Sequence, residues 1–184
     1  MRKGIFSLAL IGLVQFSYAQ QDKHFSMFFA NAVQLNPAAA GHFEGDIQLF
    51  TNYRTQWFSI SENPFRSVSA SVDGRLFEQS LNNGFFGAGL NFYHDQSGDS
   101  QYQMNIISLP INYSIELNKT SYLSVGMQPA YYAQTMDKTA MYFDNQWDGG
   151  GFNTSISSGE SLGFQNVSKF DLSSGIYYVN SPTK

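Results

Sequence analysis

The chain of 184 residues has no cysteine, few charged residues and no apolar run long enough to form a membrane-spanning helix. Without cysteine, a disulfide framework and a lipid-modified amino-terminal cysteine are both excluded. Charged residues make up 13% of the chain, about half of the share that is usual in a soluble domain. The formal net charge of −4 speaks against a nucleic-acid partner.

The amino terminus has the pattern of a secretion signal. Residues 1–3 include two basic side chains, residues 5–14 are apolar, and the small residues Ser17 and Ala19 precede Gln20. Because the apolar stretch is shorter than the ~20 residues of a transmembrane helix, we predict a signal peptide at 1–19 that is cleaved before Gln20. Cleavage removes two positive charges and changes the formal net charge from −4 to −6.

Aromatic residues are abundant, although the chain is not hydrophobic on average. They make up 16% of the sequence, while the mean hydropathy is −0.26. A membrane β-barrel combines these properties, because its strands alternate lipid-facing apolar residues with polar residues that face the lumen.

Alternation with a period of two residues predicts about six strands from residue 46 onward. The clearest runs are 107–115 and 123–134, and the others are 46–58, 65–76, 84–95 and 169–180. Pro110 and Pro129 lie inside the two clearest runs, although proline normally occurs at a sheet edge or a bulge.

The connections alternate between short and long. Segments 77–83 and 116–119 are short, whereas 135–168 is long and polar, which predicts periplasmic turns and an external loop. We therefore predict an all-β fold, an antiparallel transmembrane β-barrel of the bacterial outer membrane. Since such barrels have eight strands or more, either the long loop contains two more strands or 46–184 is an incomplete amino-terminal portion, and we expect the second. A periplasmic-side lead-in is expected at 20–45.

The sequence offers no catalytic constellation, so we predict a protein that is not an enzyme and has no cofactor. The glycines at 84, 87 and 89 are followed by no helical pattern, which argues against a dinucleotide loop. The three histidines are not spaced to share a metal ion. Asp144 and Asp148 resemble the start of a calcium loop, but Ser155 replaces the acid of its twelfth position, so they remain weak calcium candidates.

Two segments contain candidate binding residues. In QLNPAAAG at 34–41, Asn36 before Pro37 favours an extended or turned backbone, and the small residues up to Gly41 permit close packing. In the strand candidate 46–58, alternation places Arg54 and Gln56 on the lumen face and Trp57 on the opposite face. We expect Arg54 either to grip a partner or plug segment or to form an internal ion pair with Asp73 on the next strand.

The order of several motifs resembles the PorP/SprF family of the Bacteroidetes type IX secretion system. The motifs are Gln21-Asp22, Phe25-Ser26, Phe29, Asn31, Leu35-Asn36-Pro37-Ala38, Ala40-Gly41, Asn52-Tyr53-Arg54, Gln56-Trp57, Pro64-Phe65, Ser71-Val72-Asp73, Leu117-Asn118-Lys119, Leu123-Ser124-Val125-Gly126 and Asn145-Gln146-Trp147-Asp148. The resemblance implies an outer-membrane barrel longer than this chain.

The resemblance also implies a function. It indicates a non-enzymatic outer-membrane component that supports the secretion or surface attachment of proteins with type IX sorting domains, including gliding adhesins. Its expected partners are these secreted proteins, the periplasmic ring components of the machinery and outer-membrane lipid. Two alternatives share the strand pattern: a porin or small-solute channel, and a soluble periplasmic β-sandwich that binds a ligand.

Extraction separates the membrane barrel from the soluble sandwich. We expect the protein to stay with the membrane in alkaline carbonate, to require detergent for release and to migrate differently on gels with and without heating. Release of the folded protein by carbonate alone would favour the sandwich.

Overall fold

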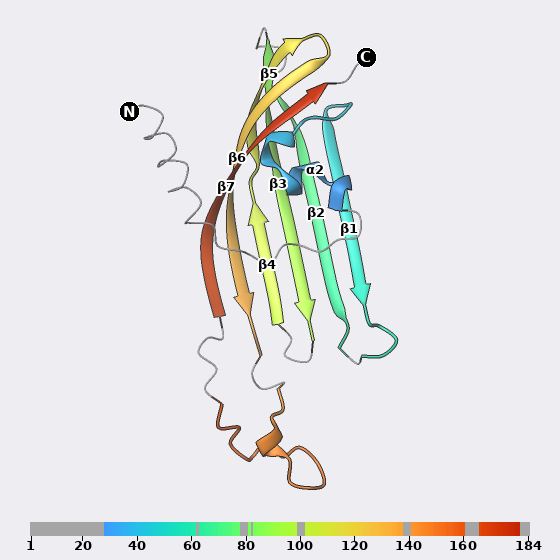
Figure 1. The fold of residues 1–184 in the computed structure, drawn as a ribbon, viewed down its shortest axis with the longest axis vertical. Coiled ribbons are helices and arrows are strands. Elements are labelled where there is room, and N and C mark those ends of the chain that lie inside the picture. The colour runs from blue at the N-terminus through green and yellow to red at the C-terminus, as the bar shows by residue number, and fades with distance from the viewer. Residues whose placement is uncertain are drawn as a thin grey trace, which may run out of the picture.

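The described chain forms one antiparallel sheet with short helical turns at its amino-terminal end (Figure 1). The computed structural model describes residues 28–61, 63–77, 81, 83–98, 102–137, 141–160 and 166–180. The strands are β1 (Ile47–Gln56), β2 (Phe65–Leu76), β3 (Gly84–Ser97), β4 (Tyr102–Ser108), β5 (Ile111–Asn118), β6 (Ser121–Thr135) and β7 (Asn166–Asn180). The helices are η1 (Phe28–Ala30), α2 (Ala32–Leu35), η2 (Pro37–Ala39) and η4 (Asp144–Gln146).

None of the helices in the described part of the chain is both long and apolar enough to cross a membrane.

The seven described strands fill six positions in the sheet, because β4 and β5 lie end to end between β3 and β6. Each other strand pairs with its neighbour along the chain, and β1 and β7 form the two edges of the described sheet. The predicted antiparallel strands are therefore confirmed. The run 107–115 is divided into the end of one strand and the beginning of the next.

The two prolines that interrupt the alternation meet at the break between β4 and β5. Pro110 lies in the break, and its carbonyl accepts the Gly89 N–H at 2.9 Å. Pro129 lies inside β6, where its carbonyl accepts the Leu109 N–H at 3.0 Å. The backbone N and C=O of one strand residue point toward the same neighbouring strand. The nitrogen of Pro129, which has no hydrogen to donate, therefore points toward the break between β4 and β5. Pro129 thus lies in an internal strand of the described sheet, beside a break in the neighbouring strands and not at a sheet edge.

The sheet has an apolar outer face and an inner face that is largely polar but also buries Phe85, Tyr93 and Ile106. Outward side chains that are at least one third exposed include Val72, Leu90, Phe92, Ile107, Ile111, Ile115, Leu123, Val125, Met127, Leu172 and Ile176. Buried polar side chains of the inner face include Ser69, Ser71, Asp73, Asn91, Ser108, Asn112, Ser114, Ser124 and Gln128. A soluble domain places these two classes the other way round. The predicted fold class is confirmed as an all-β, β-barrel-like outer-membrane fold.

Strand β1 ends earlier than predicted. It stops at Gln56 because Trp57 has a positive φ of 61° and begins a turn, in which its carbonyl accepts the N–H groups of Ile60 and Ser61. Trp57 therefore does not continue the strand alternation, and its predicted place on the strand face opposite Gln56 is wrong.

The connections are grouped by end of the sheet. The turns between β2 and β3 and between β5 and β6 lie at one end, and the long connection between β6 and β7 lies at the other (Figure 1). The two predicted short turns and the predicted long connection thus lie at opposite ends, although the short connection between β3 and β4 lies at the end of the long one. Their assignment to the periplasmic and external sides remains a prediction, and the predicted signal peptide lies outside the described residues.

A charged side chain on the outer face should destabilise the protein in a manner that depends on depth. Met127 is 47% exposed near the middle of β6, and Leu117 is 55% exposed near the end of β5. We expect Met127→Arg to lower the free energy of unfolding by about 2–4 kcal/mol, because this position lies near the middle of the membrane. Leu117→Arg should lower it by about 0–1 kcal/mol, because this position lies near the membrane surface. Urea unfolding in lipid vesicles measures both. Equal costs would contradict a lipid boundary at this face.

Candidate functional site

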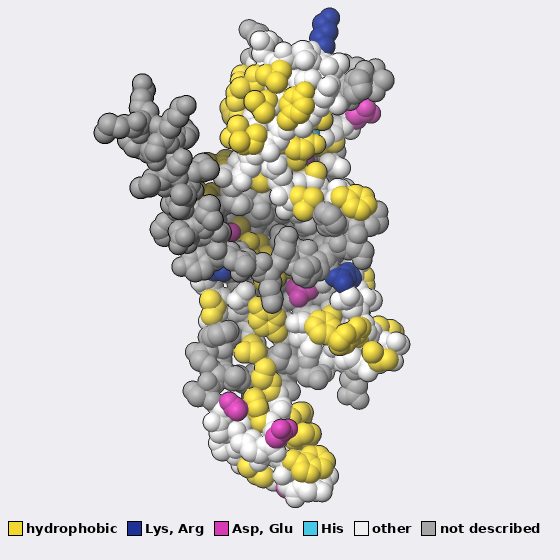
Figure 2. All heavy atoms as spheres, in the orientation of Figure 1, with side chains coloured by type: hydrophobic (Ala, Val, Ile, Leu, Met, Phe, Trp, Pro, Cys, Tyr) yellow, Lys and Arg dark blue, Asp and Glu magenta, His cyan; other side chains and the backbone are white. Residues whose placement is uncertain are grey.

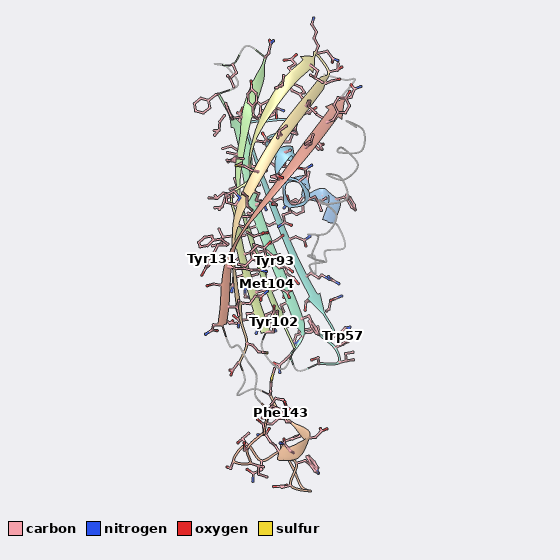
Figure 3. The ribbon with its side chains drawn as sticks, turned by 60° about the vertical axis from the view of Figure 1, so that its left-hand side comes forward. Trp57, Tyr93, Tyr102, Met104, Tyr131 and Phe143 are labelled. Atoms are coloured by element: carbon pink, nitrogen blue, oxygen red, sulfur yellow. The ribbon has the colours of Figure 1, made fainter. Side chains whose placement is uncertain are left out.

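The candidate site is the inner face of the sheet together with the segment that lies on it. Residues 31–43, called the plug below, run across β2, β3, β5, β6 and β7 in the half of the sheet that carries the short turns (Figures 1 and 3). The contact is close, since Ala38 and Ala40 are 0% exposed. The described part of the lead-in predicted at 20–45 therefore packs against the inner face through residues 31–43.

The plug crosses the sheet along one row of paired residues. Strand register aligns one residue from each of five strands, Arg75, Gly87, Asn112, Gly126 and Gly175. Three members of this row are glycines, and the plug lies directly against them, with its backbone above Gly87 and Gly126 and the Asn36 side chain above Gly175. We call this set the glycine row.

The glycines are required because the plug leaves no room for a Cβ atom. A Cβ at Gly126 would lie 2.7 Å from the backbone N of Ala38. A Cβ at Gly87 would overlap the Ala40 carbonyl oxygen, and one at Gly175 would overlap the Asn36 side chain. Such distances are too short for non-bonded atoms, so a side chain at these positions would push the plug off the sheet.

Asn112 lies at the centre of the glycine row and binds the plug backbone. Its Nδ2 donates to the carbonyls of Ala40 at 2.7 Å, Ala38 at 2.9 Å and Pro37 at 3.4 Å. Its Oδ1 accepts the Gly87 N–H at 2.9 Å. The plug residues at this contact are buried, so water does not supply hydrogen bonds to their carbonyls. The Asn112 amide supplies these hydrogen bonds instead.

Two charged side chains of β2 hold the end of the plug. Asp73 Oδ2 accepts the Gly41 N–H at 2.8 Å. Arg75 donates from Nε to the Gly41 carbonyl at 2.6 Å and from Nη2 to the Phe43 carbonyl at 2.7 Å. Gly41 has a φ of +77°, and a Cβ there would lie 3.0 Å from the Phe85 ring, so both backbone and space require glycine.

Two asparagines combine helix capping with contacts to the sheet. Asn36 Oδ1 accepts the Ala38 N–H at 3.0 Å at the start of η2, while its Nδ2 donates to the Ile176 carbonyl at 2.9 Å. Asn31 caps α2 in the same way and donates from Nδ2 to Ser71 Oγ at 2.8 Å. Proline suits the first position of η2, since its fixed φ matches a helical start.

His42 occupies an aromatic pocket beside the glycine row. Its Nε2 lies 2.6 Å from Ser124 Oγ and 3.0 Å from Ser114 Oγ. Its ring centroid lies 5.1 Å from Phe85, 5.1 Å from Tyr177 and 5.9 Å from Tyr122. Burial, and secondarily the positive charge of Arg75, lowers the pKa of His42 from 6.5 to about 4. The imidazole is therefore neutral at neutral pH.

The chain was compared with families, with curated proteins and with solved structures. A family model described as type IX secretion system membrane protein PorP/SprF matches residues 17–183. The chain belongs to the PorP/SprF family. This membership makes it a membrane component of the type IX secretion system. No curated protein and no solved structure matches it.

The structure of this PorP/SprF protein brings together half of the site residues predicted from the sequence. Asn36, Pro37 and Gly41 lie in the plug. Arg54 and Gln56 lie at the far end of β1 from the glycine row, and Trp57 follows in the next turn, where its ring packs edge-on against Phe65 at 5.5 Å. Their role in binding remains a prediction.

The predicted ion pair between Arg54 and Asp73 is wrong. Register places Arg54 opposite Ser67 and Asp73 opposite Gln48, which separates the two charges by six residues along the sheet, or about 20 Å. Asp73 instead accepts the Gly41 N–H of the plug. The acid near the Arg54 end of the inner face is Asp95, whose Oδ1 accepts the Ser67 hydroxyl at 2.5 Å.

The predicted calcium candidates lie in the loop between β6 and β7, at the lower end of Figure 2. Asp148 Oδ1 accepts the N–H groups of Gly150 and Gly151 at 3.0 and 3.1 Å and thereby closes a turn. Among the described residues, no three His, Cys, Asp or Glu side chains are grouped to hold a metal ion. The weak calcium prediction for Asp144 and Asp148 remains a prediction.

Sequence reasoning did not select Asn112, Arg75, His42 or the glycine row. In the sequence, the strand residues among them are only small or polar residues at inward positions. Every barrel strand has such residues, so this pattern does not distinguish a binding site. The arrangement they form is suited to holding an extended peptide segment by its backbone, since Asp73, Arg75 and Asn112 all bind backbone atoms of the plug.

Adding one methyl group to the glycine row should loosen the plug. We expect Gly126→Ala to destabilise plug docking by about 1–3 kcal/mol, because the new Cβ overlaps the Ala38 backbone. Limited proteolysis of the purified protein should then cut within residues 31–43 faster. Gly150→Ala is the matched control, since a Cβ there meets only the side chain of Asp148 at 3.7 Å. Equal cleavage of both variants would contradict the docked plug.

Proposed function

We propose that the chain is a non-enzymatic outer-membrane component of the type IX secretion system that supports the secretion or surface attachment of sorting-domain proteins such as gliding adhesins. The observation that carries this proposal is the family match across residues 17–183. The apolar outer face of the sheet supports placement in the outer membrane, because lipid is the partner that such a surface fits. Export by a cleaved signal peptide is part of the proposal.

The plug gives this function a physical means of contacting partners. Its docked backbone fixes the amino-terminal segment beside the short turns, where periplasmic components can reach it on the proposed topology. We infer that Asn36, Pro37 and Gly41 shape the surface that the periplasmic ring components recognise. The far end of the inner face, with Arg54, Gln56 and Trp57, is proposed to contact secreted clients.

The position of the plug argues against the porin alternative. A solute channel needs an open water-filled lumen, whereas the plug lies across the inner face of β2, β3, β5, β6 and β7. The sandwich alternative is opposed by the outer face, because a sandwich requires a second sheet to cover an apolar face and none covers it among the described residues.

Deletion of the gene tests the proposed function. We expect the surface and extracellular proteome to lose at least one protein with a type IX sorting domain, while the outer membrane otherwise keeps its composition. Unchanged secretion together with altered uptake of small solutes would overturn the proposal and favour the porin.

Plug variants test whether the docked segment takes part in secretion. We expect Asn36→Ala, which removes the bond to the Ile176 carbonyl, and Gly41→Val, which clashes with Phe85, to reduce client secretion at normal protein abundance. Gly151→Val is the matched control, because no atom lies within 4 Å of its Cβ position. Immunoblots of membrane and medium measure both quantities. Normal secretion by both plug variants would contradict a role for the segment.

A further inference from the structure

The plug forms hydrogen bonds to the sheet through three of its own side chains, and one of them gains a charge in acid. Asn31 and Asn36 form neutral hydrogen bonds with Ser71 and the Ile176 carbonyl. His42 is the titratable member, and it follows directly after Gly41, whose N–H and carbonyl bind Asp73 and Arg75. A change at His42 therefore acts on the most strongly held part of the plug.

The pocket of His42 is built for a neutral imidazole. Its polar partners are the hydroxyls of Ser114 and Ser124, which also lie 2.7 Å from each other, so the three groups form a closed hydrogen-bonded triangle. The remaining walls are the rings of Phe85, Tyr122 and Tyr177.

The charged groups around the pocket also oppose a proton on His42. Arg75 of β2 is the charged group that acts on the imidazole, and its guanidinium already lies 4.8 Å from the centre of the Phe85 ring. The face of an aromatic ring attracts cations, but Arg75 already lies over the Phe85 ring. A second positive charge on His42 would be repelled by the Arg75 guanidinium. Of the carboxylates, Asp73 is engaged with Gly41, and Glu116 of β5 lies opposite Tyr122 rather than the serines. Glu44, two residues after His42, is exposed.

We propose that His42 is a proton-operated latch, in which protonation of the imidazole releases the plug from the inner face of the sheet. The proton binds at a ring nitrogen, the imidazole becomes a cation that donates at both nitrogens, and the cation leaves the aromatic pocket for water. The sheet keeps its strand pairing, because none of the bonds that the plug makes belongs to the ladders. Release exposes the glycine row, which is the part of the inner face that binds backbone.

The direction and the range of pH follow from linkage. The pKa of His42 is about 4 in the docked plug and 6.5 in the released plug, so the released plug binds the proton more readily. The contribution of His42 to docking is therefore complete above pH 6.5. It falls as the pH decreases from 6.5 to 4 and stays constant below pH 4. Between pH 7 and pH 5 this lowers the docking equilibrium about 20-fold. Acidification therefore shifts the latch toward its open state.

Hydrogen exchange of the purified full chain in detergent micelles tests the latch. We expect amides of residues 31–43 to lose about 20-fold of their protection between pH 7 and pH 5, after correction for the intrinsic exchange rate, while amides of β6 keep theirs. His42→Gln, which keeps a side chain able to bond both serines but does not titrate, should show no such pH dependence. An unchanged wild-type plug, or an equal response in His42→Gln, would overturn the proposal.

A disulfide staple provides a second test that leaves His42 in place. The chain has no cysteine, and a Cβ at Gly175 lies 2.9 Å from Asn36 Cγ, so Asn36→Cys with Gly175→Cys can join plug and sheet. The oxidised protein should keep its protection at pH 5, and reduction should restore the pH response. An equal loss of protection in the oxidised protein would overturn the proposal, since a held plug cannot be released.

Discussion

The close approach of the plug backbone to the glycine row is the constraint on which the rest of the site depends. Gly87 and Gly126 allow the plug backbone to contact the sheet, and Gly175 leaves room for the Asn36 side chain, so a side chain at any of these positions would prevent the contact. Only at this distance can a side chain as short as that of Asn112 reach the carbonyls of Pro37, Ala38 and Ala40. The small residues of the plug and the glycines of the sheet therefore form one feature.

The polarity of the two faces follows from the same arrangement. A plug held by its backbone needs buried donors and acceptors, and the inner face supplies them from Asp73, Arg75 and Asn112. Most apolar side chains of the strands are then left for the outer face, whereas Phe85, Tyr93 and Ile106 are buried on the inner face. Lipid is the surrounding that suits the exposed apolar side chains. The sheet thus separates a hydrogen-bonded interior from a hydrophobic exterior. This explains how a chain with a mean hydropathy of −0.26 belongs to a family of membrane proteins.

The proposed function and the proposed latch depend on the plug in different ways. A role in secretion uses the docked segment as a surface for partners of the type IX machinery. The latch concerns how firmly that segment is held, which His42 controls through its burial and through the nearby charge of Arg75. A chain whose secretion role is carried by other parts of the barrel can still have a latch, and a permanently docked plug can still serve as a partner surface.

The sequence by itself determined the fold class, the approximate strands and the close packing of the segment around Asn36, because these follow from local properties. Alternation assigns each residue to one of two faces, and Asn-Pro followed by small residues indicates a turned, closely packed backbone. It also predicted the family from the order of its motifs, which the family match confirms.

Only the tertiary structure decided which inward residues meet. Register between strands that are distant in the sequence aligned Gly87, Asn112, Gly126 and Gly175, and no local pattern specifies such a row. The same register separated Arg54 from Asp73 and left Asp73 free to bind Gly41. His42 was ordinary in the sequence, since its burial and its two serine partners come from strands β5 and β6 folded around it.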